Sequence, residues 1–95
     1  MTEVTTAEQL RTLHDHLQAT ESLPVERTAN RWLGEAEAVA GDLVGADLPE
    51  SVVRERVGHV VELLSHVDDT GSEAADEHVL EAKRLADEVL VKLAD

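Results

Sequence analysis

Apolar residues recur along this chain at alternating steps of four and three, and this spacing limits the fold more than any other feature. Because an α-helix has about 3.6 residues per turn, such a pattern gathers its members on one side of a helix. A short stripe and three longer ones follow the pattern: Leu10, Leu13 and Leu17; Val25, Ala29, Trp32, Ala36, Val39 and Leu43; Val53, Val57, Val60, Leu64 and Val67; Ala75, Val79, Ala82, Ala86, Val89 and Leu93. No segment alternates strictly between apolar and polar residues as a strand does, so the sequence predicts an all-α protein.

Residues that start and stop helices stand between these stripes. Thr5 and Thr70 are each followed three residues later by a glutamate, which is the spacing of a capping box at a helix N-terminus. Pro24 and Pro49 suit the first turn of the helices that follow them. Gly45 and the segment DDTGS are typical of helix ends. One helix is therefore expected for each stripe.

The segments between the stripes are short, and short connections favour antiparallel neighbours. We therefore expect residues 1–95 to form a single domain, an up-and-down antiparallel four-helix bundle. The first helix has the narrowest apolar stripe. A three-helix core with that helix loosely docked is the alternative.

The charge of the chain is strongly unbalanced. It has 21 acidic residues against 8 basic ones, a formal net charge of −13. Repulsion at this density destabilises a compact state, and salt screens it, since the Debye length falls to ~3 Å at 1 M. The acidity also argues against a nucleic-acid partner, because binding to phosphates needs a basic surface.

Taken over the whole chain, the sequence resembles the short acidic helical proteins of halophilic archaea that have no assigned function. Its most distinctive parts in this respect are ANRWLGEAEAVAGDLV and DEHVLEAKRLADEVL. The resemblance implies a lineage and a salt-rich solvent, and it transfers no catalytic or binding residue. Under this interpretation the acidity is an adaptation to the solvent.

Other features narrow the class of protein. The chain has no cysteine, so it has no disulfide framework, no thiolate nucleophile and no cysteine-based metal site. It has no apolar run long enough to cross a membrane and no basic-then-apolar signal at its N-terminus. We expect a cytoplasmic protein without a membrane partner.

Trp32 is the only aromatic residue of the Phe, Tyr and Trp types. Its place in the apolar stripe predicts that it is the central anchor of the core, packed against small residues such as Ala82 and Ala86. The alternative is a hot spot for binding on the surface.

We expect no physiological metal site and no cofactor. The nearest approach to a metal site is a run of two glutamates and two histidines along one side of the third helix, namely Glu55, His59, Glu62 and His66. Such residues are also ordinary on a solvated helix face, and the Glu-x-x-His pair of di-iron bundles does not occur.

An enzymatic function is the second hypothesis. Glu73 and Asp76, together with Glu35 and Glu37, are weakly similar to the acidic magnesium sites of all-α nucleotide pyrophosphohydrolases. The Glu-Glu-x-x-Glu cluster of such sites is missing, and no phosphate loop or nucleophile elbow is present. Carboxylates of the second and fourth helices that converged in a cavity would favour this metal- or nucleotide-binding hydrolase.

The last helix has more apolar surface than one core requires. Leu80 and Val91 lie about 100–120° around the helix from Val79, with Arg84 and Asp87 between them on the same line. A two-fold dimer would bury both apolar residues and bring Arg84 to an acidic residue of the other chain. The next candidate surface is a strip of small residues on the second helix, Gly34, Ala38 and Gly41.

The first hypothesis is therefore a non-enzymatic helical bundle that acts by contact with itself, as a homodimer, or with an unknown protein partner. An acidic mimic of nucleic acid, which would occupy a basic protein surface, is a third possibility.

Overall fold

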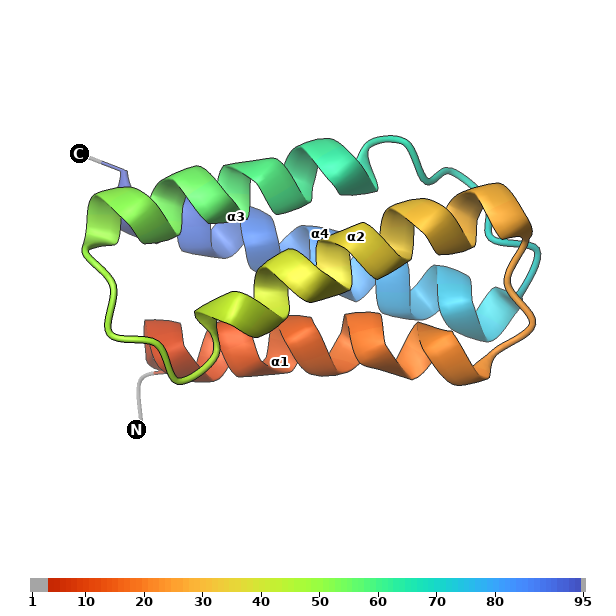
Figure 1. Cartoon of the computed structure of the whole chain (residues 1–95), viewed down its shortest axis with the longest axis horizontal. Helices are drawn as coiled ribbons and strands as arrows, with labels where there is room; N and C mark the ends of the chain where they lie inside the picture. Colours follow the sequence, from red (N-terminus) through yellow and green to blue (C-terminus); the bar gives the residue numbers. More distant parts are fainter. Residues whose placement is uncertain (1–3, 95) are drawn as a thin grey trace.

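The structure, a computed structural model, describes residues 4–94. These residues contain four α-helices and one short 3-10 turn. The elements in chain order are α1 (Thr6–Ala19), η1 (Thr20–Ser22), α2 (Arg27–Leu43), α3 (Glu50–Leu64) and α4 (Glu73–Leu93). Successive helices run in opposite directions along the long axis of the molecule (Figure 1). The expected up-and-down four-helix bundle is confirmed.

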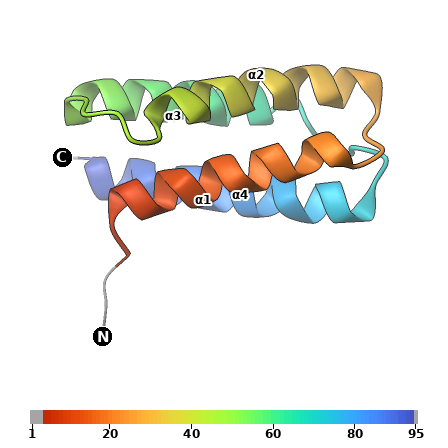
Figure 2. The ribbon, with the colours of Figure 1, turned by 60° about the horizontal axis from the view of Figure 1, so that its bottom comes forward.

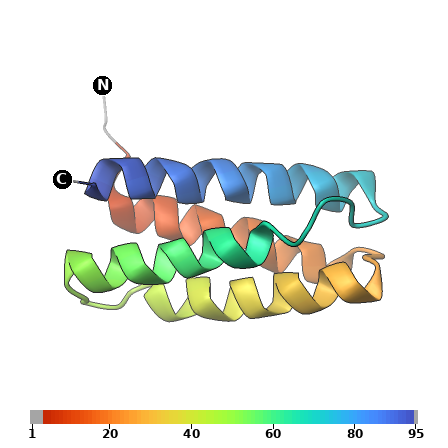
Figure 3. The ribbon, with the colours of Figure 1, turned by 90° about the horizontal axis from the view of Figure 1, so that it is seen from above.

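The helices pack as a ring of four neighbours. α1 lies against α2 and α4, and α3 lies against the same two helices from the other side (Figures 2 and 3). The alternative of a three-helix core is wrong, because α1 packs along both of its neighbours and buries Leu10, Leu13 and Leu17 completely or nearly so.

The core between the helices is made of leucine, valine and alanine. The fully buried large side chains come from all four helices and from the segment after α3, and they include Leu13, Leu17, Leu33, Val57, Val60, Leu64, Val67 and Val89. Most residues of the stripes predicted for α3 and α4 are buried, although Val53 and Leu93 are only partly so. Leu63 and Leu85, which lie outside those stripes, are buried as well. Val67 is buried although α3 ends at Leu64, so the chain keeps contact with the core after the helix has ended.

The stripe predicted for α2 is wrong at two positions in the middle of the helix, where Leu33 and Ala40 are buried in place of Trp32 and Val39. The buried residues are Ala29, Leu33, Ala36, Ala40 and Leu43. Trp32 is only partly buried at the edge of the core, so it is not the central anchor. An indole in the core needs a partner for its N–H group. Leu33 fills the central position without that requirement.

Helix ends follow the sequence signals in part. The Thr5 hydroxyl accepts a hydrogen bond from the Glu8 backbone N–H at 3.1 Å, which confirms the first cap. Gly45, where the second helix was expected to end, has a φ of +74°, which glycine adopts without strain. The second capping box is wrong, because Ser72 caps α4 and Thr70 lies two residues before it with other partners. The placement of the prolines in first turns is wrong, because α2 begins at Arg27, three residues after Pro24, and Pro49 is the N-cap of α3.

Candidate interaction face on α4

The outer face of α4 carries the most exposed large apolar side chains of the described residues. Leu80 is 68% exposed and Val91 is 77% exposed. They are eleven positions apart in the sequence, which returns a helix to within about 20° of the same direction. Arg84 and Asp87 lie between them and are exposed too. The structure therefore places all four residues predicted for an interface on one solvent-facing strip, which we call the α4 strip.

Charged groups on α4 surround the apolar residues of the α4 strip. Arg84 lies 2.6 Å from a carboxylate oxygen of Glu81 and 2.6 Å from one of Glu88. The hydrogen bond from Arg84 holds the pKa of Glu81 below its usual value, and the same bond raises the pKa of Arg84. Arg84 is thus paired within its own helix. Three of its five N–H groups serve these bonds, so two remain for another acceptor.

A shallow hollow of about 490 Å³ lies beside Val91. Its lining comes from both α4 and α1, and consists of Gln9, Arg84, Asp87, Glu88, Val91 and Lys92. The Lys92 ammonium group joins the two helices here, because it donates to the Val4 carbonyl at 2.9 Å and to the Gln9 side chain at 3.4 Å. No local pattern in the sequence indicates this contribution of α1, since it depends on how the helices pack.

The four residues considered for a metal are all exposed on or just after α3. These are Glu55, His59, Glu62 and His66. His66 follows the end of the helix and stacks on Trp32 instead, with ring centroids 4.1 Å apart and ring planes 13° apart. Within residues 4–94 no group of three or more histidine, aspartate, glutamate or cysteine side chains is placed to hold a metal ion.

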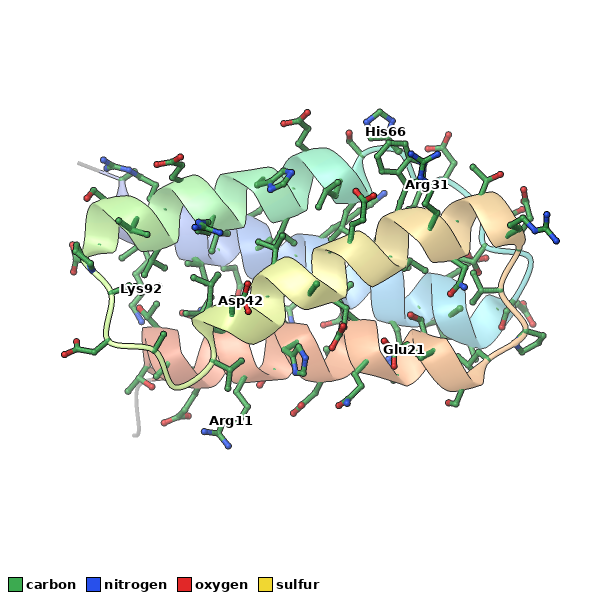
Figure 4. The ribbon with its side chains drawn as sticks, viewed as in Figure 1. Arg11, Glu21, Arg31, Asp42, His66 and Lys92 are labelled. Carbon is green, nitrogen blue, oxygen red and sulfur yellow. The ribbon has the colours of Figure 1, made fainter. Side chains whose placement is uncertain are left out.

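Trp32 lies between two charged or polar neighbours at the seam of α2 and α3. The Arg31 guanidinium carbon is 5.5 Å from the centre of the indole ring, and His66 covers the ring as described above. Figure 4 shows Arg31 and His66 close together at this seam. The ring is therefore largely shielded by side chains of the same molecule.

The carboxylates considered for an enzymatic site do not converge. A carboxylate oxygen of Glu37 is 2.7 Å from Nε2 of His14 on α1. Asp76 accepts hydrogen bonds from the backbone N–H and the hydroxyl of Thr70, each at 2.8 Å. These two bonds, the backbone one first, hold the pKa of Asp76 below its usual value. Glu35 and Glu73 are exposed, so each carboxylate has a structural partner or faces solvent.

A pair of histidines joins α1 to α4 and was not anticipated. The Nδ1 atoms of His16 and His78 are 2.9 Å apart, and the rings are partly buried. A hydrogen bond between two ring nitrogens needs one donor and one acceptor, so one Nδ1 donates to the other. His14 and His16 point to different neighbours, α2 and α4, as their spacing on the helix predicts. The pairing itself spans 62 residues and leaves no local pattern in the sequence.

The strip of small residues on α2 is only partly a free surface. Gly34 and Ala38 are exposed, and the space around Gly34 is open. A Cβ atom at Gly41 would lie 3.2 Å from Nε2 of His14, so this glycine admits a side chain of α1. The smooth surface is therefore shorter than the spacing of its residues predicts.

Comparison with known proteins adds a family and no activity. The profile of a family described as a domain of unknown function (DUF8152) matches residues 9–95. No curated protein and no solved structure matches the chain. Among the described residues, no helix has both the length and the apolar character needed to cross a membrane.

Proposed function

The chain belongs to the DUF8152 family, and we propose that it is a non-enzymatic protein that acts by protein–protein contact through the α4 strip. One observation carries the proposal: Leu80 and Val91 stand 68% and 77% exposed on one face, although six other apolar residues of α4 are buried. Exposed apolar groups gathered on one face, rimmed by charged residues, are typical of interaction sites.

The arrangement of the carboxylates supports contact over catalysis. The two that have partners, Glu37 and Asp76, are bonded to His14 and Thr70, and the others considered face solvent. A hydrolase of the pyrophosphohydrolase type needs several carboxylates directed at one metal ion. The hydrogen bonds of Glu37 and Asp76 instead tie helices and loops of the bundle together.

We further infer that this contact takes place in the cytoplasm of a salt-rich cell. The support is the net charge of −13 and the resemblance to acidic proteins of halophilic archaea. At molar salt the repulsion between acidic surfaces falls off within ~3 Å. Two acidic proteins can then approach closely enough for apolar side chains to meet.

Affinity capture from the native host in molar KCl tests the proposal. The bait is the full chain, compared with the Leu80→Glu/Val91→Glu variant and with Ala38→Glu on the outer face of α2 as a matched control. We expect the double variant to lose the bound protein, whether another protein or further copies of the chain, and Ala38→Glu to keep it. Circular dichroism checks that all three are folded. Equal capture by the double variant and the wild type would contradict the proposal.

A further inference from the structure

We propose that the partner bound by the α4 strip is a second copy of this chain, packed with its α4 antiparallel about a two-fold axis between Leu85 and Ala86. This inference rests on the proposed function and adds the identity and the register of the partner. Antiparallel packing about a two-fold axis places each residue level with the one equally far on the other side of the axis. A strip that binds a second copy of itself must therefore have complementary residues at equal distances on the two sides of the axis.

The apolar residues of the α4 strip meet this condition. Leu80 and Val91 are equally distant from the axis along the sequence, so each Leu80 lies level with Val91 of the second copy. Both side chains point outward within about 20° of the same direction. The two exposed apolar groups of one copy thus cover the two of the other, and the dimer leaves neither unpaired.

The shape of the surface agrees with this register. Leu80 projects from the helix at 68% exposure. The hollow of about 490 Å³ lies beside Val91, at the other end of the strip. In the antiparallel pair the Leu80 side chain of one copy lies over the hollow of the other, and this happens twice by symmetry. A parallel arrangement would instead place Leu80 against Leu80 and leave both hollows empty.

The charges on the α4 strip also match their own reverse. Arg84 and Asp87 are equally distant from the axis, so Arg84 comes level with Asp87 of the second copy and close to its Glu88. Arg84 has two N–H groups left after its bonds to Glu81 and Glu88 of its own helix. Charge complementarity of this kind fixes register more than it adds affinity.

The chemistry of the contact sets its strength and its response to salt. Two large apolar side chains a copy make a small interface beside the ~1,000 Å² of a stable complex, so the dimer dissociates on dilution. Carboxylates outnumber cations on and beside each strip, where Glu81, Asp87 and Glu88 surround Arg84, and the whole chain is acidic. Added salt therefore strengthens association instead of weakening it.

Engineered cysteines test the register, because the chain has none of its own. Leu80→Cys and Val91→Cys are made in two copies with tags of different mass, mixed in molar KCl and oxidised mildly. When the Leu80→Cys copy pairs with the Val91→Cys copy, one end of the interface brings the two cysteines together. At the other end the natural Val91 of the first copy lies against the natural Leu80 of the second. Ser51→Cys, exposed on α3 and outside both candidate surfaces, measures cross-linking by random collision.

We expect the mixed product of residues 80 and 91 to exceed both self-linked products by about tenfold. Two copies of residue 80 would lie about 16 Å apart along antiparallel helices, beyond the Cα separation of about 4.4–6.8 Å that a disulfide spans. Self-linked products in excess would show a parallel pair. Cross-linking no greater than that of Ser51→Cys would show no pair at all. Either result overturns the inference.

Light scattering separates a failure of this inference from a failure of the proposed function. The wild type should reach the mass of two chains at high concentration in molar KCl, and Leu80→Glu/Val91→Glu should stay at the 10.3 kDa of one. One further outcome is a wild type that is monomeric but still captures another protein, while the double variant captures none. This outcome would overturn the self-pairing and leave the α4 strip as a contact surface.

Discussion

Helices α2 and α4 start at the same end of the bundle and are tied to the same residue, yet they are built differently. Thr70 is fully buried between them. Its carbonyl accepts the Glu26 N–H at the start of α2, at 2.7 Å, and its N–H and hydroxyl donate to Asp76 in the first turn of α4. α4 also has a side-chain cap, Ser72, whereas no side chain caps α2.

The two helices differ most in how their apolar residues are distributed. α4 has a line of buried apolar residues along its whole length, and its two exposed large apolar residues, Leu80 and Val91, lie on its outer side. α2 has apolar residues next to each other at Trp32–Leu33 and at Val39–Ala40, and its outer side presents the small residues Gly34 and Ala38. A helix with a single buried face can be oriented from its sequence. A helix with two adjacent apolar lines cannot, because they differ by only about 100°.

The largest expected effect is on the free energy of unfolding. It shows which of the two apolar lines of α2, the one with Trp32 or the one with Leu33, packs in the core. Leu33 is 1% exposed, so Leu33→Ala should cost about 2–5 kcal/mol in the free energy of unfolding. Trp32→Ala should cost only about 1–2 kcal/mol, the ordinary range for a residue outside the core. Urea unfolding in molar KCl measures both. A larger cost at Trp32 than at Leu33 would restore the tryptophan as the anchor of the core.

The difference between α2 and α4 also explains which parts of the fold could be predicted from the sequence. The number, order and direction of the helices could be predicted, since each has a stripe and start or stop signals stand between the stripes. The buried face of α4 could be predicted as well, because Ala75, Val79, Ala82, Ala86 and Val89 form one unambiguous line. For α2 the choice between Trp32 and Leu33 depends on which line the neighbouring helices can cover, and that is decided in three dimensions.

The candidate interaction face could likewise be predicted only in part. The exposure of Leu80 and Val91 followed from the width of the apolar arc, which is a local property of one helix. The hollow beside Val91 did not, because Gln9 of α1 reaches it only after packing. The pairing of His16 with His78 is another contact between distant segments, and no spacing within a helix could have indicated it.

A smaller effect separates two glycines of α2, Gly34 on its outer side and Gly41 against α1. Gly34→Ala should stabilise the fold by up to about 1 kcal/mol, because alanine is the better helix former and the space around Gly34 is open. Gly41→Ala should be neutral or destabilising. Its methyl group would lie 3.2 Å from Nε2 of His14 and would displace the ring that bonds Glu37. Thermal unfolding in molar KCl measures the difference. An equal gain at both positions would show that α1 does not pack closely on Gly41.

The smallest effect concerns the end of the bundle that α2 and α4 share. The two bonds from Thr70 hold the pKa of Asp76 below its usual value, which is about 3.9 for an aspartate. A carboxyl whose pKa is lower in the folded state stabilises the fold at any pH above the usual value. That contribution is lost as the pH falls through the lowered pKa. Acid should therefore loosen the joint at Thr70, and neutral pH should keep it closed.

Asp76→Asn isolates this contribution from the other carboxyl groups of the chain. The asparagine oxygen can still accept from Thr70, but it does not titrate. We expect the wild type to be the more stable of the two at pH 6, and the difference between their urea midpoints to shrink as the pH falls from 5 towards 2.5. Glu77→Gln, an exposed neighbour on α4, is the control and should show no such trend. A difference that stays constant with pH would mean that Thr70 holds α4 by the geometry of its bonds and not by the charge of Asp76.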